Sequence, residues 1–325
     1  MNKFLFLNLL LFIAVSCKQP GGDKKVNTAA GNMDAREPRI FAEGIISTGD
    51  YETHPAFSPS GDTLYFLKCF PDANFCTICV SCKNDTVWTN PEVAPFSGKW
   101  LDADPFVTKD GKTIYFVSNR PVKEGDAVKP DWDIWKTQRN AEGWDKPIHL
   151  DSPFNSSGSE FFPTIADNGN FYFGSSREGG KGRADIYVSK LINGKYATPE
   201  NLGDSINTPD NEYEPFIAPD ETYMIFMATF PNGIANADFC ISYNKNGRWS
   251  KAKKLPAPVN SEATEWGGKV SRDGKYFFFG SNRNKINNVL PGNENIQQLN
   301  ARLKAAGNGL GDIYYVNFSF LDPQK

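Results

Sequence analysis

Three polar side chains, His54, Asp104 and Glu214, stand at equivalent places in a pattern that recurs along this 325-residue chain. Each copy has an acidic residue, two variable residues and then Pro or Gly, and these three residues directly precede a Pro. Two carboxylates that face one pocket can act as general acid and general base in glycoside cleavage. The alternative is that His54, Asp104 and Glu214, with Trp266 in the fifth copy, line a solvated opening that binds a ligand without reacting with it.

The acidic residue itself is present in all five copies, as Glu52, Asp102, Glu160, Glu212 and Glu265. Side chains two residues apart on a strand point the same way, so this acid ring is expected beside the polar set, near one opening. There it would bind a cation through oxygen atoms, or raise the pKa of Asp104 or Glu214 by like charge. The other interpretation is structural, with each carboxylate accepting N–H bonds within its own unit or pairing with a repeated Arg. Occurrence in every copy favours the structural role.

The elements that must position these residues are repeats of about 50 residues. The shared motif occupies residues 54–66, 104–116, 162–173, 214–226 and 267–279, and its anchors are Pro55, Pro105, Pro163, Pro215 and Gly268. Each copy predicts a strand, a turn of the Asp-Gly type and an aromatic second strand, which together form a hairpin. A third strand opens at Asp-Ile-Tyr or Asp-Ile-Trp, and a fourth runs from an aromatic residue to Pro and Leu. Four strands per repeat are typical of a β-propeller blade.

Charged residues also recur at the ends of these strands. Second strands are followed by Arg120, Arg177 and Arg283, and third strands open at Asp133, Asp185 and Asp312. We expect each Arg to meet the Asp of its own repeat across the hairpin as a charge-assisted pair.

These motifs resemble the PD40 repeat, a WD40-like family that includes the TolB propeller and many exported bacterial proteins. The resemblance covers about residues 37–325 and implies an all-β, five-bladed propeller of four-stranded blades, although TolB-type propellers usually have six. The last repeat stops after its third strand, whereas residues 37–48 match the end of a fourth. We therefore predict that the N-terminal strand closes the last blade and removes two sheet edges. The resemblance leaves function open, because such repeats occur in binding proteins, scaffolds and enzymes.

The N-terminus predicts export. Residues 1–16 read as a signal peptide, with Lys3 before an apolar run that is too short to cross a bilayer. Residues 14–17 (AVSC) resemble a bacterial lipobox, which implies cleavage before Cys17 and acylation of that Cys; an ordinary signal peptide with an incidental Cys is the alternative. Residues 17–36 are expected to be the lipidated Cys and a flexible tether. Lys18 rather than Asp follows Cys17, and by resemblance to enterobacterial sorting this favours the outer membrane.

Four of the six Cys residues lie in the first repeat: Cys69, Cys76, Cys79 and Cys82. Cys69 stands where other repeats carry the Asn of Ser-Asn-Arg, Phe70 replaces the Arg, and Cys76 falls beside the Asp place. We expect a Cys69–Cys76 disulfide to clamp this hairpin, and Cys79 and Cys240 to be packed thiols. A metal site of the Cys-x-x-Cys-x-x-Cys type is the alternative. Export favours disulfides, and one strand cannot aim Cys79 and Cys82 at one ion, so no metal or cofactor is predicted.

Residues 284–310 interrupt the last repeat between its second and third strands. Apolar residues at helical spacing, Ile296, Leu299, Leu303 and Ala306, predict a short helix, with Gly307 as its C′ residue. This helix either caps apolar surface, walls a binding site or meets a partner.

Composition narrows the function classes. A net charge of −3 gives no basic footprint for nucleic acid, and the content of 39% hydrophobic and 14% aromatic residues suits a globular all-β domain. We expect a lipid-anchored envelope propeller that acts as a non-catalytic binding or scaffold module for a glycan or a protein. The alternative is a polysaccharide-degrading hydrolase or lyase with its site at the top face, and the sequence leaves open whether the protein is an enzyme.

Overall fold

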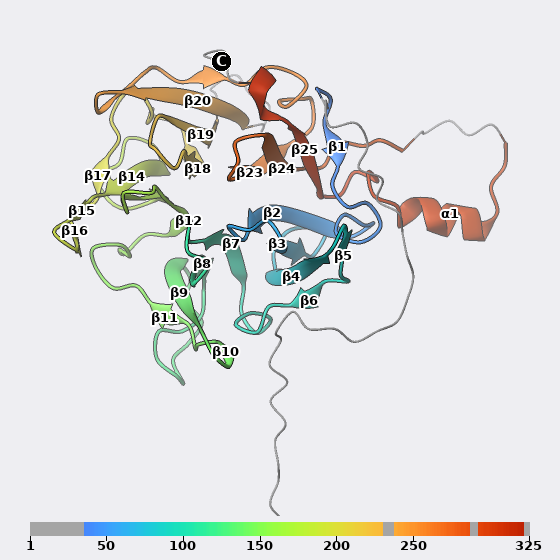
Figure 1. Ribbon diagram of the computed structural model, residues 1–325, viewed down its shortest axis with the longest axis horizontal. Helices are drawn as coiled ribbons and strands as arrows, with labels where there is room; N and C mark the ends of the chain where they lie inside the picture. Colours follow the sequence, from blue (N-terminus) through green and yellow to red (C-terminus); the bar gives the residue numbers. More distant parts are fainter. Residues whose placement is uncertain (1–35, 230–236, 287–291, 322–325) are drawn as a thin grey trace, which may run out of the picture.

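Five antiparallel sheets are arranged around a common axis in the computed structural model, which describes residues 36–229, 237–286 and 292–321 (Figure 1). The predicted five-bladed all-β propeller is therefore confirmed. In every blade the innermost strand is followed in the chain by the two strands that pair outward from it. We call the side on which these innermost strands begin the upper face.

The blades follow one another in chain order. Blade 1 contains β2 (Tyr51–Phe57), β3 (Thr63–Cys69), β4 (Cys76–Asn84), β5 (Val87–Trp88) and β6 (Glu92–Val93). Blade 2 contains β7 (Asp102–Val107), β8 (Thr113–Ser118), β9 (Asp133–Asn140), β10 (Gly143–Trp144) and β11 (Ile148–His149). Blade 3 contains β12 (Glu160–Ile165), β13 (Phe171–Ser175), β14 (Asp185–Ser189) and β17 (Glu200–Asn201), with the hairpin β15 (Leu191–Ile192) and β16 (Lys195–Tyr196).

Blades 4 and 5 complete the ring. Blade 4 contains β18 (Glu212–Ile217), β19 (Tyr223–Ala228), β20 (Asp238–Lys245), β21 (Arg248–Trp249) and β22 (Lys253–Lys254). Blade 5 contains β23 (Glu265–Val270), β24 (Tyr276–Ser281) and β25 (Asp312–Asn317), and its outer strand is β1 (Arg39–Ile40). A 3-10 turn, η1 (Phe318–Phe320), follows β25.

The N-terminal strand closes blade 5, as predicted. Arg39 pairs with Tyr315 and Ile40 with Tyr314 in antiparallel register. Ser47 donates its hydroxyl to the carbonyl of Ile313 at 3.2 Å and accepts the Ile313 N–H at 3.1 Å. In blade 3, Asn207 makes the equivalent two hydrogen bonds to the backbone of Ile186. Residues 37–48 therefore take the place of the fourth strand of blade 5 and of the loop that follows it.

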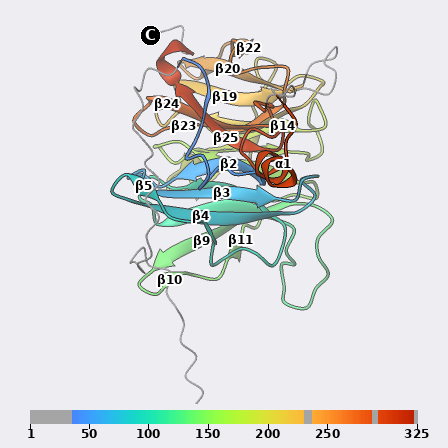
Figure 2. The same ribbon diagram turned by 90° about the vertical axis from the view of Figure 1, so that its right-hand side faces the viewer.

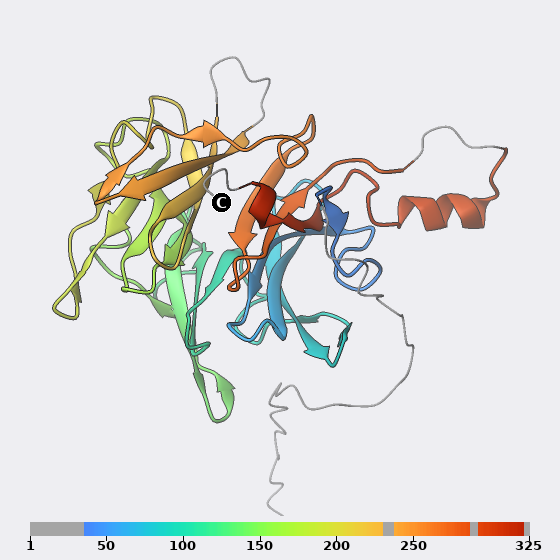
Figure 3. The same ribbon diagram turned by 45° about the horizontal axis from the view of Figure 1, so that its top comes forward.

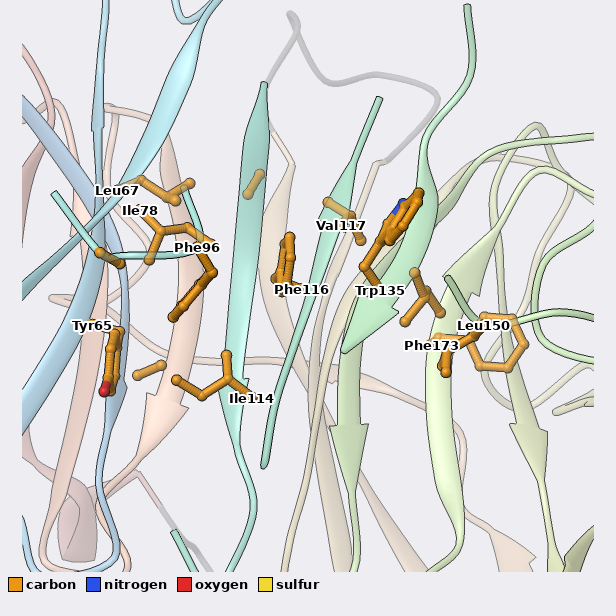
Figure 4. Packing of buried hydrophobic residues seen from close by; sticks show 14 of the residues in the cluster. Tyr65, Leu67, Ile78, Phe96, Ile114, Phe116, Val117, Trp135, Leu150 and Phe173 are labelled. Carbon is orange, nitrogen blue, oxygen red and sulfur yellow. The ribbon is translucent and has the colours of Figure 1, made fainter. Parts of the chain in front are cut away.

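The core lies between the blades and is largely aromatic. The last Phe of the repeated motif is fully buried in every copy: Phe66, Phe116, Phe173, Phe226 and Phe279. Figure 4 shows this packing, with Phe116, Trp135 and Phe173 among the rings and Leu150 and Val117 among the aliphatic side chains between them. Repetition of the motif therefore repeats the same sheet-to-sheet contact around the ring.

The predicted disulfide in blade 1 is present. Cys69 and Cys76 are joined at a Cα–Cα distance of 4.1 Å, where β3 and β4 pair. Cys79 and Cys240 are buried free thiols, as expected from their places on the third strands. In this hairpin the exposed Phe70 stands in place of the Arg of the other repeats. Lys68 instead pairs with the acid-ring residue Glu52 at 3.0 Å.

The insertion in blade 5 forms the predicted helix, α1 (Ile296–Leu303), which is one turn shorter than the sequence indicated. Asn295 caps its first turn in a capping box with Gln298, whereas Lys304 ends it and Ala306 and Gly307 lie beyond. The helix projects from the upper face past the edge of the disc (Figures 1 and 3). In the described ranges no helix has the length and apolar character needed to span a membrane.

Candidate functional site

The innermost strands all contain a bulge, where the pairing shifts register between the residue two before the anchor and the residue after it, so the variable residue before the anchor lies within the bulge. The five residues at this place have positive φ: His54 (51°), Asp104 (52°), Phe162 (50°), Glu214 (54°) and Gly267 (64°). Left-handed backbone is uncommon for residues other than Gly, so its presence in every blade marks it as part of the architecture. The bulge interrupts the strand's alternation and brings these residues together at the axis.

His54 lies between the two carboxylates that the sequence singled out. Its Nε2 is 3.6 Å from an oxygen of Asp104 and 3.6 Å from an oxygen of Glu214. Those two oxygens are therefore no more than about 7 Å apart. The imidazole stacks on Phe162 with ring centres 5.5 Å apart, and both of its buried nitrogens are without a hydrogen-bond partner. The three predicted residues thus form one central cluster, which we define as His54, Asp104, Glu214 and the neighbouring Lys269.

Lys269 is the member that the sequence reasoning missed. Burial lowers the pKa of its ammonium to about 8, while the charges of Asp104 and Glu214 oppose that change. The signal was available in the sequence, because the position directly after the anchor carries Ala56, Phe106, Thr164 and Phe216 in the other copies. Lys269 is the one cationic residue at a position that carries small or apolar residues in the other copies, so it marks a difference between blades.

The carboxyl of Asp104 is buried and has a raised pKa. Burial raises its pKa to about 7; His54 and Lys269 lower it, and the charge of Glu214 raises it. The carboxylate accepts the backbone N–H of Phe162 at 3.2 Å, and Glu214 accepts the N–H of Gly267. The like charge therefore comes from Glu214 across the axis. The expectation that the neighbouring acid-ring residue Asp102 supplies it was wrong.

The space within the cluster is small. In this conformation, the space that these residues line has no gap wide enough to admit a water molecule. Close backbone approach contributes, since a Cβ on Gly267 would lie 2.9 Å from the Cα of His54. A Cβ on Gly268 would lie 2.7 Å from the rings of Phe239 and Phe277. In this conformation His54 occupies the place between the carboxylates that a reacting substrate atom would need.

The acid ring lies apart from the central cluster, inside the individual blades. Its five carboxylates are 0–1% exposed, and each accepts a hydroxyl bond from the Ser or Thr before its strand: Thr48 to Glu52, Ser97 to Asp102, Ser156 to Glu160, Thr208 to Glu212 and Ser261 to Glu265. These bonds agree with the structural interpretation. The bulge explains why residues two apart in the chain have different surroundings. In the described segments, no group of three or more His, Cys, Asp or Glu side chains is arranged to hold a metal ion.

The repeated Arg residues pair with the acid ring, so the expected pairing with the third-strand Asp was wrong. The pairs are Arg120–Asp102, Arg177–Glu160 and Arg283–Glu265. Each guanidinium donates through Nε to the Ser two residues earlier, which turns it back toward its own inner strand. The third-strand acids have other partners: Asp133 contacts Lys129 and His149, while Asp185 and Asp312 accept backbone N–H bonds.

Trp266 lies beside the cluster, at the boundary between blades 5 and 1. Its ring stacks on Tyr51 at 5.6 Å with an interplanar angle of 15°, and its buried Nε1 has no hydrogen-bond partner. Burial and the charge of Glu214 raise the pKa of Tyr51 and of Tyr213, which places both phenols within range of that carboxylate. We call Tyr51, Phe162, Tyr213 and Trp266 the aromatic rim, because their half-buried rings surround the central cluster.

Replacing Asp104 with Asn should change how stability depends on pH. The pKa of Asp104 is raised from its ordinary 3.8 to about 7, so folding favours the protonated acid. This contribution is complete below about pH 4 and is lost as pH rises through about 7. The neutral Asn side chain does not titrate, so the variant does not lose stability in this way. Relative to the wild type, its free energy of unfolding should therefore rise by up to about 4 kcal/mol across this pH window. Urea unfolding of both proteins over that range measures the difference, and parallel profiles would contradict the raised pKa.

No protein-family model matches this sequence, and no curated protein matches it. Among solved structures it is similar to an α-L-arabinofuranosidase from Lactobacillus brevis, at 12% identity and a TM-score of 0.51, over 85% of this chain and 92% of that one. TolB from Acinetobacter baumannii matches at 13% identity and a TM-score of 0.46, over 82% of this chain. This chain spans 54% of the TolB chain, and 42% of a puromycin-hydrolysing peptidase from Mycobacterium tuberculosis that matches at 14% identity and a TM-score of 0.42. Identities this low show the propeller fold alone.

Proposed function

We propose that this protein is a non-catalytic binding or scaffold module of the cell envelope, which holds a glycan or another envelope protein at its upper face. The observation that carries the proposal is the closed central cluster. His54 fills the space between Asp104 and Glu214, both of its neighbouring carboxylates are buried, and the remaining gaps do not admit water. A hydrolase needs a water molecule or a nucleophile beside the substrate at this place.

The aromatic rim supports binding at the mouth of the axis. Half-buried rings such as Tyr51 and Trp266 offer flat apolar faces, and such faces contribute strongly to recognition of sugars and proteins. Thr53 and Trp266 each hold a buried polar atom without a partner. Both atoms lie close to Gly280, because a Cβ there would stand 2.2 Å from Thr53 Oγ1 and 2.5 Å from Trp266 Nε1.

The proposed location rests on the N-terminus. Cys17 and the expected tether lie outside the described residues, so acylation, outer-membrane placement and membership of the PD40 repeat family are parts of this proposal. The disulfide-clamped hairpin at Cys69 and Cys76 supports an exported protein, because disulfides form in oxidising compartments.

A polysaccharide-degrading enzyme is the second candidate, and one observation favours it. Two carboxyl oxygens no more than about 7 Å apart, with the pKa of Asp104 raised to about 7, suit a general acid and its partner. This function requires His54 to swing out from between Asp104 and Glu214 when substrate arrives.

The test is a panel of polysaccharides offered to the purified protein and scored for both binding and release of reducing ends. We expect binding without release. Trp266→Ala should weaken it by about tenfold or more, because the substitution removes a stacking face. Asp104→Asn and Glu214→Gln should change affinity much less. Trp144→Ala, in outer strand β10, is the matched control and should bind like the wild type.

Two results would decide against this proposal. Reducing ends that appear with the wild type and vanish with Asp104→Asn would establish the enzyme. Binding that survives Trp266→Ala unchanged would place the ligand away from the aromatic rim.

A further inference from the structure

Helix α1 turns an apolar face to solvent. None of its residues is buried, and Ile296 and Leu303 are 60% and 56% exposed. Ile296, Leu299 and Leu303 are spaced by three and four residues, so they lie along one side of the helix. A surface helix ordinarily directs such a face toward the core, and here the described blades leave it uncovered.

The helix is nevertheless held in one orientation. A Cβ on Gly49 would lie 2.3 Å from the carbonyl carbon of Lys304, which shows how closely the end of α1 contacts the chain before blade 1. Asn308 donates to the carbonyl of Gly49 at 3.0 Å and to that of Leu303 at 2.9 Å. Figure 2 shows α1 on the same side of the disc as the arrowhead of β3. The exposed side chains are therefore presented in a fixed direction.

The first described residues of the chain contact the base of this insertion. Lys285 donates through Nζ to the carbonyl of Pro38 at 3.1 Å, and a Cβ on Gly307 would lie 3.6 Å from the Cδ1 of Ile40. Nineteen residues separate Cys17 from Glu37, which reach on the order of 60 Å when fully extended. An acylated Cys17 would therefore keep α1 within reach of the bilayer.

The charge of the insertion differs from that of the whole chain. Residues 284–310 contain three cationic side chains, Lys285, Arg302 and Lys304, against one acid, Glu294, which is ion-paired with Arg302. The net positive charge of the insertion therefore rests on Lys285 and Lys304, whereas the chain as a whole has a net charge of −3. Cationic groups beside an exposed apolar helical face are typical of segments that lie on anionic lipid surfaces.

We propose that α1 lies against an anionic lipid surface, with Ile296, Leu299 and Leu303 among the acyl chains and Lys304 near the headgroup phosphates. This inference rests on the lipid anchor of the proposed function. Because α1 projects beyond the edge of the disc, the contact leaves the aromatic rim open to a ligand (Figure 1).

Amide hydrogen exchange tests the contact in the acylated wild-type chain reconstituted into vesicles. In phosphatidylglycerol-containing vesicles, exchange across residues 296–303 should be about tenfold slower or more than in phosphatidylcholine alone. Ile296→Gln combined with Leu303→Gln should abolish the difference, since Gln keeps a good helix propensity without the apolar face. Ile192→Gln is the control, because Ile192 is 55% exposed on the hairpin β15–β16 across the disc and should leave the protection intact.

The outcomes separate this contact from the anchor. Protein that floats with the vesicles while α1 exchanges equally in both lipids would overturn the contact and leave the anchor standing. Protection that appears only after envelope proteins are added would overturn it in favour of a protein interface. Protein that does not float would overturn both.

Discussion

Deleting residues 37–48 is expected to unfold the propeller. The segment supplies β1, the outer strand of blade 5, and it also packs against blade 1. Phe41 contacts the rings of Phe57, Trp88 and Phe278, and Ile46 is fully buried. Burial of each such side chain contributes about 1.5–3 kcal/mol, and a whole domain is stable by only about 5–15 kcal/mol. The deletion removes the pairing in blade 5, the packing against blade 1 and the closure of the ring. The free energy lost is therefore expected to exceed the stability of the remaining fold.

Thermal and urea unfolding followed by circular dichroism measure this effect. Deleting residues 18–36 is the matched control, and it should leave the melting temperature unchanged. Ile46→Ala in the full chain should cost about 2–5 kcal/mol, because it leaves a cavity where blades 5 and 1 meet. If the two truncations melt alike, the N-terminal segment does not close the ring in solution.

Cys17→Ser is expected to release the protein from membranes completely. Several acyl chains on one residue give a stable anchor, since membrane affinity grows with each buried methylene. The three apolar side chains of α1 bury less hydrocarbon than one fatty acid, and a single myristoyl chain already binds only weakly. The proposed helix contact therefore orients the anchored protein without holding it at the membrane alone. Fractionation by ultracentrifugation and labelling with a fatty-acid probe measure the result.

The control for this substitution is Cys240→Ser, which replaces a buried free thiol and should leave both fractionation and labelling unchanged. An unlabelled wild type that stays with the membrane fraction would end the lipoprotein interpretation. The protein would then be an exported propeller held at the envelope by its partners.

Internal repetition made the fold readable from the sequence. Five copies of one motif act as an alignment within a single chain, so the strand order, the blade number and the missing fourth strand of blade 5 could all be predicted. The same comparison identified Cys69 and Cys76, because Cys69 replaces the Asn that follows the second strand in other repeats and Cys76 lies beside the Asp place that opens the third. It also separated His54, Asp104 and Glu214, which differ between blades, from the acid ring, which does not.

The acid ring shows where alternation along a strand misleads. Glu52 and His54 are two residues apart and were expected on one side, yet Glu52 contacts Thr48 and Lys68 while His54 reaches across the axis to Asp104. The cause is a left-handed residue in each inner strand, which interrupts the alternation of side chains. The Pro that follows it in four of the five strands is the sign of this bulge in the sequence. The partner of each Arg was also predicted wrongly. The Ser two residues before each Arg accepts a hydrogen bond from its Nε, and this bond turns the guanidinium back toward the inner strand of its own blade.

Local sequence by itself determined the blades, because hairpin turns, aromatic strands and their order depend on neighbours in the chain. Only the tertiary structure decided the arrangement of the central cluster. Its residues come from four blades and are separated by more than 200 positions in the sequence. Whether His54 lies between Asp104 and Glu214 or beside them, and whether Lys269 joins them, depends on how five sheets converge. The burial that raises the pKa of Asp104 to about 7 exists only once the ring has closed around it.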